Sequence, residues 1–542
     1  MKKLTHLCRL GRLPLVVSAI AGLTLVTAEQ AAAKTLDVCH RGCQYSELAP
    51  AVAAAHDGDT IAVGPGIYAG GISIDVSVAV VGAGKGSTII RGGGPVLTIG
   101  GFGATSEPTV SIHGVTITGG VTRTSPESIP FVGEEGVIAL GGGIEIPPNA
   151  DFSGGATVTI TDSTVTGNRV APTATLPYGP PCPGGPCPFA WAKGGGIDSW
   201  GTLTLDHSAV SDNRVGSASG LSRLASDAQG AGIMSWLGAL TLKSSVVSGN
   251  VAGAGGPNGR FAEGGGIWVD GGPVVTLSDS SVTNNTAVLN AALPASVELA
   301  AQPGGIFVAD GVASATISNT VISGNTAAMT NSVGDSTAFA GGINVEPDVN
   351  FELANSVVAD NTVSSMTLPG SHGDAEGDTG GGALQGTITD TRITGNVVSV
   401  SSTAGDAVAG IGGLLQFGAL TNSVVSGNRL SASSPRGSAS VLGAGVMVAE
   451  QPLTLRNTTV TGNSGAATGR HTTGRGGGIY DGPFFDIPGS ALTLRNSSVT
   501  GNSLSGSAGG LFQGGGLYLE NQSLASTNSL VSSNSPDQCF GC

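Results

Sequence analysis

Leu420-Thr-Asn-Ser-Val-Val-Ser-Gly-Asn428 is the clearest copy of a segment that recurs eleven times along the chain. Further close copies are Leu455-Arg-Asn-Thr-Thr-Val-Thr-Gly-Asn463 and Leu494-Arg-Asn-Ser-Ser-Val-Thr-Gly-Asn502. Spacing between copies varies from 32 to 45 residues, yet the pattern inside each copy does not shift. The closing Asn lies at positions 168, 213, 250, 285, 325, 361, 396, 428, 463, 502 and 534.

Fixed units separated by spacers of variable length indicate a stacked array, in which each unit buries its apolar face against its neighbours. The units are expected to be strands, because Val, Ile, Thr and Ser alternate with period two. An Asn or Asp six residues before the closing Asn predicts a tight corner, since these residues tolerate left-handed backbone angles. Stacked corners would place their side-chain amides in a ladder. The closing Gly-Asn predicts a second bend, from which a long loop begins.

A glycine motif precedes each copy and opens a further strand, as in Gly141-Gly-Gly-Ile144, Gly194-Gly-Gly-Ile197 and Gly264-Gly-Gly-Ile267. Glycine permits sharp bends and close approach of successive coils. One repeat therefore holds three short strands and one long loop, which is one turn of a parallel β-helix. We predict an all-β, single-stranded β-helix of about 13 coils.

The paired motifs resemble the right-handed parallel β-helix of pectin-lyase-like proteins. They are also similar to the two-motif repeats of bacterial polymorphic outer-membrane proteins, Gly-Gly-Ala-Ile and Phe-x-x-Asn. Here Val or Ile replaces the Phe, as in Val425-Ser-Gly-Asn428. The resemblance covers roughly residues 35–534 and implies the fold rather than an activity, because this fold hosts lyases, hydrolases, adhesins and scaffolds.

The ends of the chain suggest an exported product. Residues 1–33 have the basic, apolar and small-residue regions of a signal peptide. Residues 34–108 are expected to form an N-terminal cap and the first coils, with a short helix over 44–58 capped by Ser46. Residues 109–534 hold the β-helix repeats, and 535–542 form a cysteine-containing tail. No membrane segment is expected after cleavage.

Six cysteines follow the signal peptide, in three local pairs: Cys39 with Cys43, Cys182 with Cys187, and Cys539 with Cys542. Export favours disulfides, and local pairing is the simplest of the possible connectivities. No metal site is predicted from these residues. The acidic segment 372–378 could hold calcium, although it lacks the spacing of an EF-hand, and a solvated loop is the alternative.

The strand that the glycine motif opens is the place to seek a binding site, because the resemblance to enzymes of this fold implies a groove there. Its outward positions are Glu145, Asp198, Met234, Trp268, Phe307, Asn344, Leu384, Leu415, Met447, Tyr480 and Tyr518. Trp200 and Trp236 lie two positions further along adjacent coils. Aromatic rings on one exposed face suit sugar binding, so Trp200, Trp236, Trp268 and Phe307 are the predicted ligand-binding residues. The alternative is that the long loops bury them.

Glu145 and Asp198 fall in the same outward position of consecutive coils. Their carboxylates should therefore lie ~5 Å apart, a separation that suits a retaining glycosidase. They are the weak catalytic candidates, with two solvated carboxylates as the alternative. The recognisable catalytic patterns of the polygalacturonases and lyases of this fold are missing.

These observations predict a secreted or cell-surface β-helix protein, a monomeric, non-enzymatic adhesin or scaffold that binds extended glycans. The alternatives are a polysaccharide lyase or glycoside hydrolase, and an ice-binding protein. Ice binding would use an outward threonine row, comprising Thr159, Thr204, Thr241, Thr276, Thr316, Thr387, Thr454 and Thr493. The net charge of −15 argues against nucleic acid as a partner. No cofactor is predicted beyond the calcium option.

Overall fold

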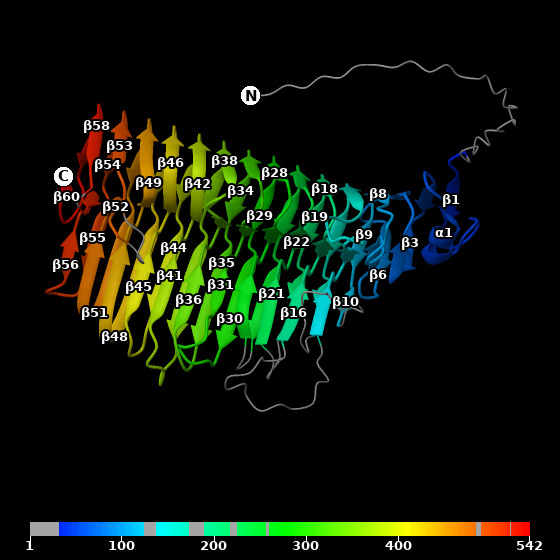
Figure 1. Cartoon of the computed structure of the whole chain (residues 1–542), viewed down its shortest axis with the longest axis horizontal. Helices are drawn as coiled ribbons and strands as arrows, with labels where there is room; N and C mark the ends of the chain where they lie inside the picture. Colours follow the sequence, from blue (N-terminus) through cyan, green and yellow to red (C-terminus); the bar gives the residue numbers. More distant parts are fainter. Residues whose placement is uncertain are drawn as a thin grey trace, which may run out of the picture.

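The computed structural model describes residues 32–123, 137–172, 189–216, 225–255, 259–483, 489–520 and 522–542. These residues form a long rod of stacked coils, with the N-terminal cap at one end and the C-terminus at the other (Figure 1). The architecture is a right-handed parallel β-helix, as predicted. Most of the predicted signal peptide and the Cys182–Cys187 pair lie outside the described residues.

The N-terminal cap contains β1 (Thr35–Val38), α1 (Leu48–Ala54) and β2 (Thr60–Val63). The helix is shorter than predicted, and Glu47, rather than Ser46, occupies its N-cap without a side-chain hydrogen bond. Leu48 and Val52 are buried, as the apolar face of a capping helix requires. No described helix is both long and apolar enough to cross a membrane.

A 26-stranded sheet receives two strands from most coils. Strands opened by glycines form its first column: β4 (Ile72–Ile74), β7 (Leu97–Ile99), β12 (Ile144–Ile146), β17 (Ile197–Ser199), β22 (Ile233–Trp236), β27 (Ile267–Asp270), β32 (Ile306–Val308), β37 (Ile343–Val345), β52 (Ile479–Asp481) and β57 (Leu517–Leu519). β60 (Cys539–Phe540), which no glycine motif opens, pairs with β57 and ends the column. Strands that precede the corner form the second: β5 (Ala79–Gly82), β8 (Thr109–His113), β13 (Thr157–Thr161), β18 (Leu203–Asp206), β23 (Leu240–Lys243), β28 (Val274–Ser278), β33 (Ser314–Ser318), β38 (Asn350–Ala354), β53 (Leu492–Arg495) and β58 (Leu524–Thr527). Three long strands belong to both columns: β42 (Gly382–Thr389), β46 (Leu414–Thr421) and β49 (Val446–Arg456).

A 14-stranded sheet receives one strand from each coil, after the corner. Its members are β3 (Gly66–Ala69), β6 (Thr88–Arg91), β9 (Thr116–Thr118), β14 (Thr164–Thr166), β19 (Ala209–Ser211), β24 (Val246–Ser248), β29 (Ser281–Thr283), β34 (Val321–Ser323), β39 (Val357–Ala359), β43 (Arg392–Thr394), β47 (Val424–Ser426), β50 (Thr459–Thr461), β54 (Ser498–Thr500) and β59 (Leu530–Ser532). The last eleven belong to the eleven motif copies, so the β-helix has about 11 turns, slightly fewer than the 13 coils predicted. Inward Ile, Leu and Val side chains from both sheets form one continuous core.

The predicted corners are present at every copy. The corner residues Asp162, His207, Ser244, Asp279, Asn319, Asn355, Asp390, Asn422, Asn457, Asn496 and Asn528 all have φ between 47° and 51°. This is the left-handed region that Asn and Asp tolerate best. The glycine of the closing Gly-Asn, such as Gly427 with φ 65°, makes the second bend.

We predicted a ladder of side-chain amides at the corner, but the main ladder is formed by the closing Asn residues. Each buried closing Asn from Asn168 to Asn502 donates from Nδ2 to Oδ1 of the next, at 2.8–3.0 Å. Gln538 receives the last amide, that of Asn534, at 3.1 Å. Corner amides are exposed and pair in places, as Asn457 with Asn422 at 3.0 Å. The closing Asn carries the ladder because its backbone lies inside the coil, where every polar group needs a partner.

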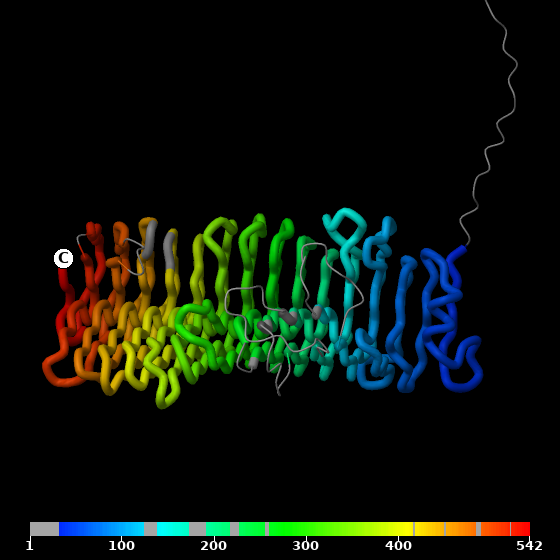
Figure 2. Tube along the Cα trace, turned by 60° about the horizontal axis from the view of Figure 1, so that its bottom comes forward, coloured from blue at the N-terminus to red at the C-terminus, as the bar shows by residue number. Residues whose placement is uncertain are grey.

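The described parts of the long loops are largely β-strands, although we expected loops without regular structure. They form a 20-stranded sheet that runs beside the coils as a second lobe (Figures 1 and 2). Its outgoing strands are β10 (Val121–Thr122), β15 (Arg169–Val170), β20 (Arg214–Val215), β25 (Val251–Gly255), β30 (Thr286–Ala291), β35 (Thr326–Asn331), β40 (Thr362–Thr367), β44 (Val397–Ser401) and β55 (Ser503–Gly506). Its returning strands are β11 (Val137–Leu140), β16 (Phe189–Lys193), β21 (Ala225–Gln229), β26 (Gly259–Glu263), β31 (Ala300–Gln302), β36 (Ser336–Phe339), β41 (Ala375–Asp378), β45 (Ala407–Gly410) and β56 (Leu511–Gln513). In β48 (Arg429–Leu442) and β51 (Ser464–Arg475), a single long strand forms both the outgoing and the returning part.

The second lobe has its own core, made largely of alanine with some Val and Leu. Two residues after the closing Asn stand apolar side chains such as Val215, Ala252 and Ala287. Two residues before the glycine motif stand others, such as Ala192 and Ala262. Small side chains let the outgoing and returning strands pack closely. This alternation was present in the sequence, but variable loop length concealed it.

Candidate functional site

The outward face of the glycine-motif strands meets the second lobe along the rod. Strand pairing places Glu145 beside Asp198, Met234 beside Trp268, and Trp268 beside Phe307, which confirms the predicted column. One member was wrong: Ala383, rather than Leu384, pairs with Asn344. Leu384 instead points into the coil core, because Gly382 takes the inward position opposite Ile343.

This face is covered rather than exposed. Glu145 and Asp198 are 4% and 0% exposed, and Trp200, Trp268 and Phe307 are 6–7% exposed. From the sequence we predicted an open aromatic face, with burial by the loops as the alternative. The structure shows burial of Trp200, Trp268 and Phe307, whereas Trp236 is partly exposed. The reason is the second lobe, whose ordered strands fold back against the column. Glu145 and Asp198 are therefore not solvated carboxylates, and a catalytic role for them stays a prediction.

The aromatic rings stack on one another from coil to coil. Trp200 and Trp236 lie with ring centroids 5.0 Å apart and planes 12° apart. Trp268 and Phe307 stack at 4.0 Å with planes 25° apart. Stacked faces cover each other, so the rings do not present the row of free faces that we predicted for an extended glycan. Stacking follows from identical register in successive coils, which sets neighbouring side chains about one strand spacing apart.

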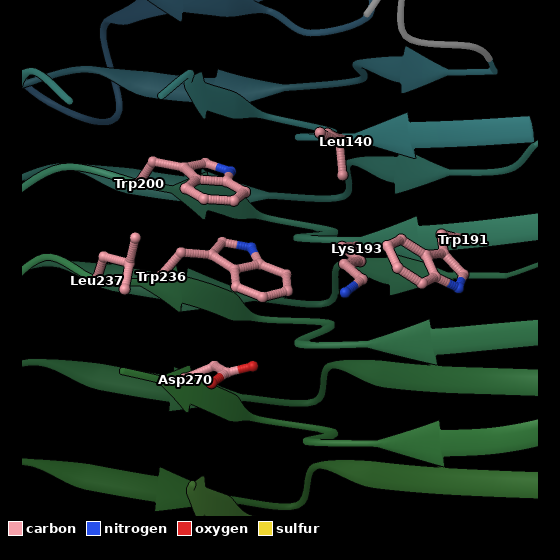
Figure 3. Close-up of a pocket in the computed structure, with 7 residues that line it drawn as sticks. All are labelled: Leu140, Trp191, Lys193, Trp200, Trp236, Leu237 and Asp270. Atoms are coloured by element: carbon pink, nitrogen blue, oxygen red, sulfur yellow. The ribbon is translucent and has the colours of Figure 1, made fainter. Parts of the chain in front are cut away.

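A pocket of about 320 Å³ lies between the coil and the second lobe (Figure 3). Its lining residues are Leu140, Trp191, Lys193, Trp200, Trp236, Leu237 and Asp270. Trp268 and Phe307 are not among them, so two of the four predicted ligand-binding residues pack in a hydrophobic cluster instead. Trp191 was not predicted. Its alternation with Ala192 in β16 is the only sequence signal that could have placed it on the pocket side.

Lys193 is the cation of the pocket. Its Nζ lies 4.0 Å from the ring centroid of Trp236 and 4.4 Å from that of Trp191, so the ammonium is held between two indoles (Figure 3). The side chain is 4% exposed. Burial lowers the pKa of Lys193 to about 8, although the nearby carboxylates oppose that shift.

Four carboxylates act on Lys193: Asp198, Asp227, Asp270 and Glu263. Burial raises the pKa of Glu263 to about 7, against hydrogen bonds from Gln229 and Gln302. Burial also raises the pKa of Asp227 and of Asp270. Sequence analysis missed Asp227 and Glu263, because both lie in segments interpreted as loops. The arrangement could exchange protons near neutral pH, and its indoles could hold an apolar ring.

The remaining predicted sites have mixed outcomes. Disulfides join Cys39 to Cys43, with Cα atoms 5.4 Å apart, and Cys539 to Cys542, at 6.0 Å. Asp378, in the acidic segment proposed for calcium, is 4% exposed in a strand of the second lobe rather than in a solvated loop. Among the described residues, no group of three or more His, Cys, Asp or Glu is placed to hold a metal ion.

The threonine row of the ice-binding alternative is aligned across coils. Thr204 pairs with both Thr159 and Thr241, and Thr454 pairs with Thr493. Glu352 and Ala419 interrupt the row, because they pair with Thr316 and Thr387. Alignment follows from the register of any β-helix and does not itself indicate ice binding.

Comparison with known proteins returned structural likenesses only. No protein-family model and no curated protein matches the chain. Among solved structures, it is similar to the A-module of the Azotobacter vinelandii mannuronan C-5 epimerase AlgE6, with 13% identity, coverage of 90% of this chain and 94% of the other, and a TM-score of 0.20. It is also similar to the PL6 family alginate lyase AlyGC, with 8% identity, coverage of 93% and 100%, and a TM-score of 0.15. Scores this low support no functional argument, so function must be inferred from the residues of this chain.

Proposed function

We propose that this chain is an exported, surface-associated β-helix protein that binds a glycan in the tryptophan pocket without cleaving it. The single observation that carries the proposal is the pocket between coil and lobe, where Trp191, Trp200 and Trp236 surround a space of about 320 Å³. Pockets of ~300–1,000 Å³ with aromatic walls are typical of small-ligand sites. The volume suits a terminal or branch sugar rather than a long row of rings.

The mode of binding follows from the contacts. Trp200 and Trp236 cover one face of each other, so a sugar ring would pack against ring edges and against the remaining Trp191 surface. The carboxylate of Asp270 lines the pocket and would accept hydrogen bonds from hydroxyl groups.

The proposal predicts that Trp236→Ala weakens glycan retention about tenfold or more, because it removes one pocket wall and the partner of Trp200. Trp268→Phe is the matched control: it alters a stacked ring outside the pocket and should retain binding. Glycan-array binding and tryptophan fluorescence titration measure both. Equal losses in the two variants, or no retained glycan with the native chain, would refute the proposal.

A polysaccharide lyase or hydrolase is the second candidate. The observation in its favour is that Lys193 lines the pocket and interacts with four carboxylates, and that burial brings the pKa of Lys193 to about 8 and that of Glu263 to about 7. Incubation of the protein with each retained polysaccharide, followed by measurement of new reducing or unsaturated ends, separates the two functions. Product formation that Asp198→Asn abolishes, with binding intact, would replace the binding proposal by the enzymatic one.

A further inference from the structure

We propose that the pocket selects an uncharged sugar and rejects uronic acids. This inference rests on the proposed function and deepens it by naming the ligand class. Three observations support it: Lys193 already interacts with carboxylates of the protein, the buried surroundings disfavour negative charge, and further acidic residues lie at the edge of the pocket.

The one cation that lines the pocket is already engaged. The Lys193 ammonium is held between the Trp191 and Trp236 rings, and four carboxylates act on it. A second cation, Arg260, acts against the burial that raises the pKa of Asp227, but it does not line the pocket. An anionic sugar would have to compete with built-in carboxylates for Lys193, in a chain whose net charge is −15.

The surroundings already disfavour negative charge. Burial raises the pKa of Asp227, Glu263 and Asp270 although Lys193 opposes the shift at each of them. A site that penalises its own carboxylates would penalise a carboxylate brought by a ligand for the same reason, namely the loss of water around the charge.

The edge of the pocket adds repulsion. Burial raises the pKa of Asp270, which lines the pocket, and that of Glu346 on the next coil but one, and the Asp310 carboxylate adds to both shifts. Asp270, Asp310 and Glu346 lie at or just after the ends of β27, β32 and β37, on three successive coils. They would repel a uronic acid polymer that lay along these coils, whereas the hydroxyl groups of a neutral sugar could donate hydrogen bonds to Asp270.

The test uses the purified chain on an array that holds both neutral and uronic acid glycans. It is followed by fluorescence titration with polygalacturonate and with its fully methyl-esterified form, which differ in charge but share a backbone. We expect array hits among neutral glycans, and weaker binding of the acid form than of the ester by at least about tenfold. Asp270→Asn should narrow that ratio several-fold, whereas Glu352→Gln, an exposed change on another face, should leave it unchanged.

Two failures are distinguishable. Preferential retention of uronic acid glycans, or a ratio that Asp270→Asn does not narrow, would overturn the ligand class and leave glycan binding intact. Absence of any retained glycan with the native chain would overturn the proposed function and this inference with it.

Discussion

The coil core and the second lobe solve the same stacking problem with different side chains. The coil core packs Ile, Leu and Val and contains the closing-Asn ladder, in segments of constant length. The second lobe packs mainly alanine, and its strands range from two residues in β15 to 14 in β48. Residues that set register must keep their spacing, whereas the lobe inherits its register from the coils and can vary in length. The coil is therefore the structural frame, and the lobe is the part free to form a pocket.

The largest effect should come from a charge placed in the coil core. Val247 is 0% exposed in β24, its neighbour Val246 is 39% exposed, and Ala252 is 0% exposed in the lobe core of the same coil. Val247→Asp should cost more than about 4 kcal/mol, because the buried carboxylate has no partner. Ala252→Asp should lower the free energy of unfolding by less, since the lobe can open locally. Val246→Asp should lower it least, because that side chain is exposed. Urea unfolding of the three variants measures this order, and an Ala252→Asp cost equal to that of Val247→Asp would remove the distinction between frame and lobe.

The next effect concerns the ladder inside the frame. Oδ1 of Asn428 accepts hydrogen bonds from the backbone N and Nδ2 of Asn396, and its own Nδ2 donates to Asn463. Asn428→Ala leaves these buried groups of Asn396 and Asn463 without their hydrogen-bond partner and should lower the free energy of unfolding by about 3 kcal/mol. The control in the same coil is Asn422→Gly, which keeps the left-handed corner at φ 50° but removes an exposed amide. It should cost less than about 1 kcal/mol. If thermal unfolding showed a larger loss of stability for Asn422→Gly than for Asn428→Ala, the stabilising ladder would be the one at the corner, as the sequence suggested.

The smallest effect should be a pH dependence confined to the lobe. Burial raises the pKa of Glu376 to about 7, with Asp374 and Asp335 adding to the shift, and raises that of the neighbouring Asp378. Because the folded pKa of Glu376 exceeds its unfolded value of 4.5, the folded state holds the proton longer. Its contribution to stability is present below about pH 4.5 and is lost as the pH rises through about 7.

Glu376→Gln should therefore flatten the fall in stability between pH 5 and pH 8 and make the variant more stable than the native chain at the upper end. Glu352→Gln, the same change at an exposed position, is the control. Urea midpoints across that pH range provide the measurement. If the urea midpoint of Glu376→Gln depended on pH as that of the native chain does, another group would be responsible for the pH dependence.

Much of the frame was predictable from the residues. The period-two alternation gave the strands, and the corner Asn and Asp residues gave the left-handed bends at nine of the eleven copies. His207 and Ser244 occupy the other two corners. The outward column, including the pairing of Glu145 with Asp198, followed from counting positions after the glycine motif, except at Leu384. Each of these depends on a local property, either backbone preference or alternation, that a single coil already expresses.

The candidate site was only half predictable. Trp200 and Trp236 were identified, but Trp191 and Lys193 reach the pocket from a returning strand of the lobe, across a loop whose length differs from coil to coil. Whether the column was open or covered depended on the lobe, and no local preference encodes that contact.

The sequence by itself determined the β-helix, its corners and the set of residues on the glycine-motif face. Only the tertiary structure decided that the closing Asn carries the buried ladder, that alanine-rich loops stack into a second lobe, and that Lys193 lies between two indoles. The physical reason is that burial is a property of assembled coils: a strand's pattern fixes which way a side chain points, but the neighbouring layer fixes what it meets there.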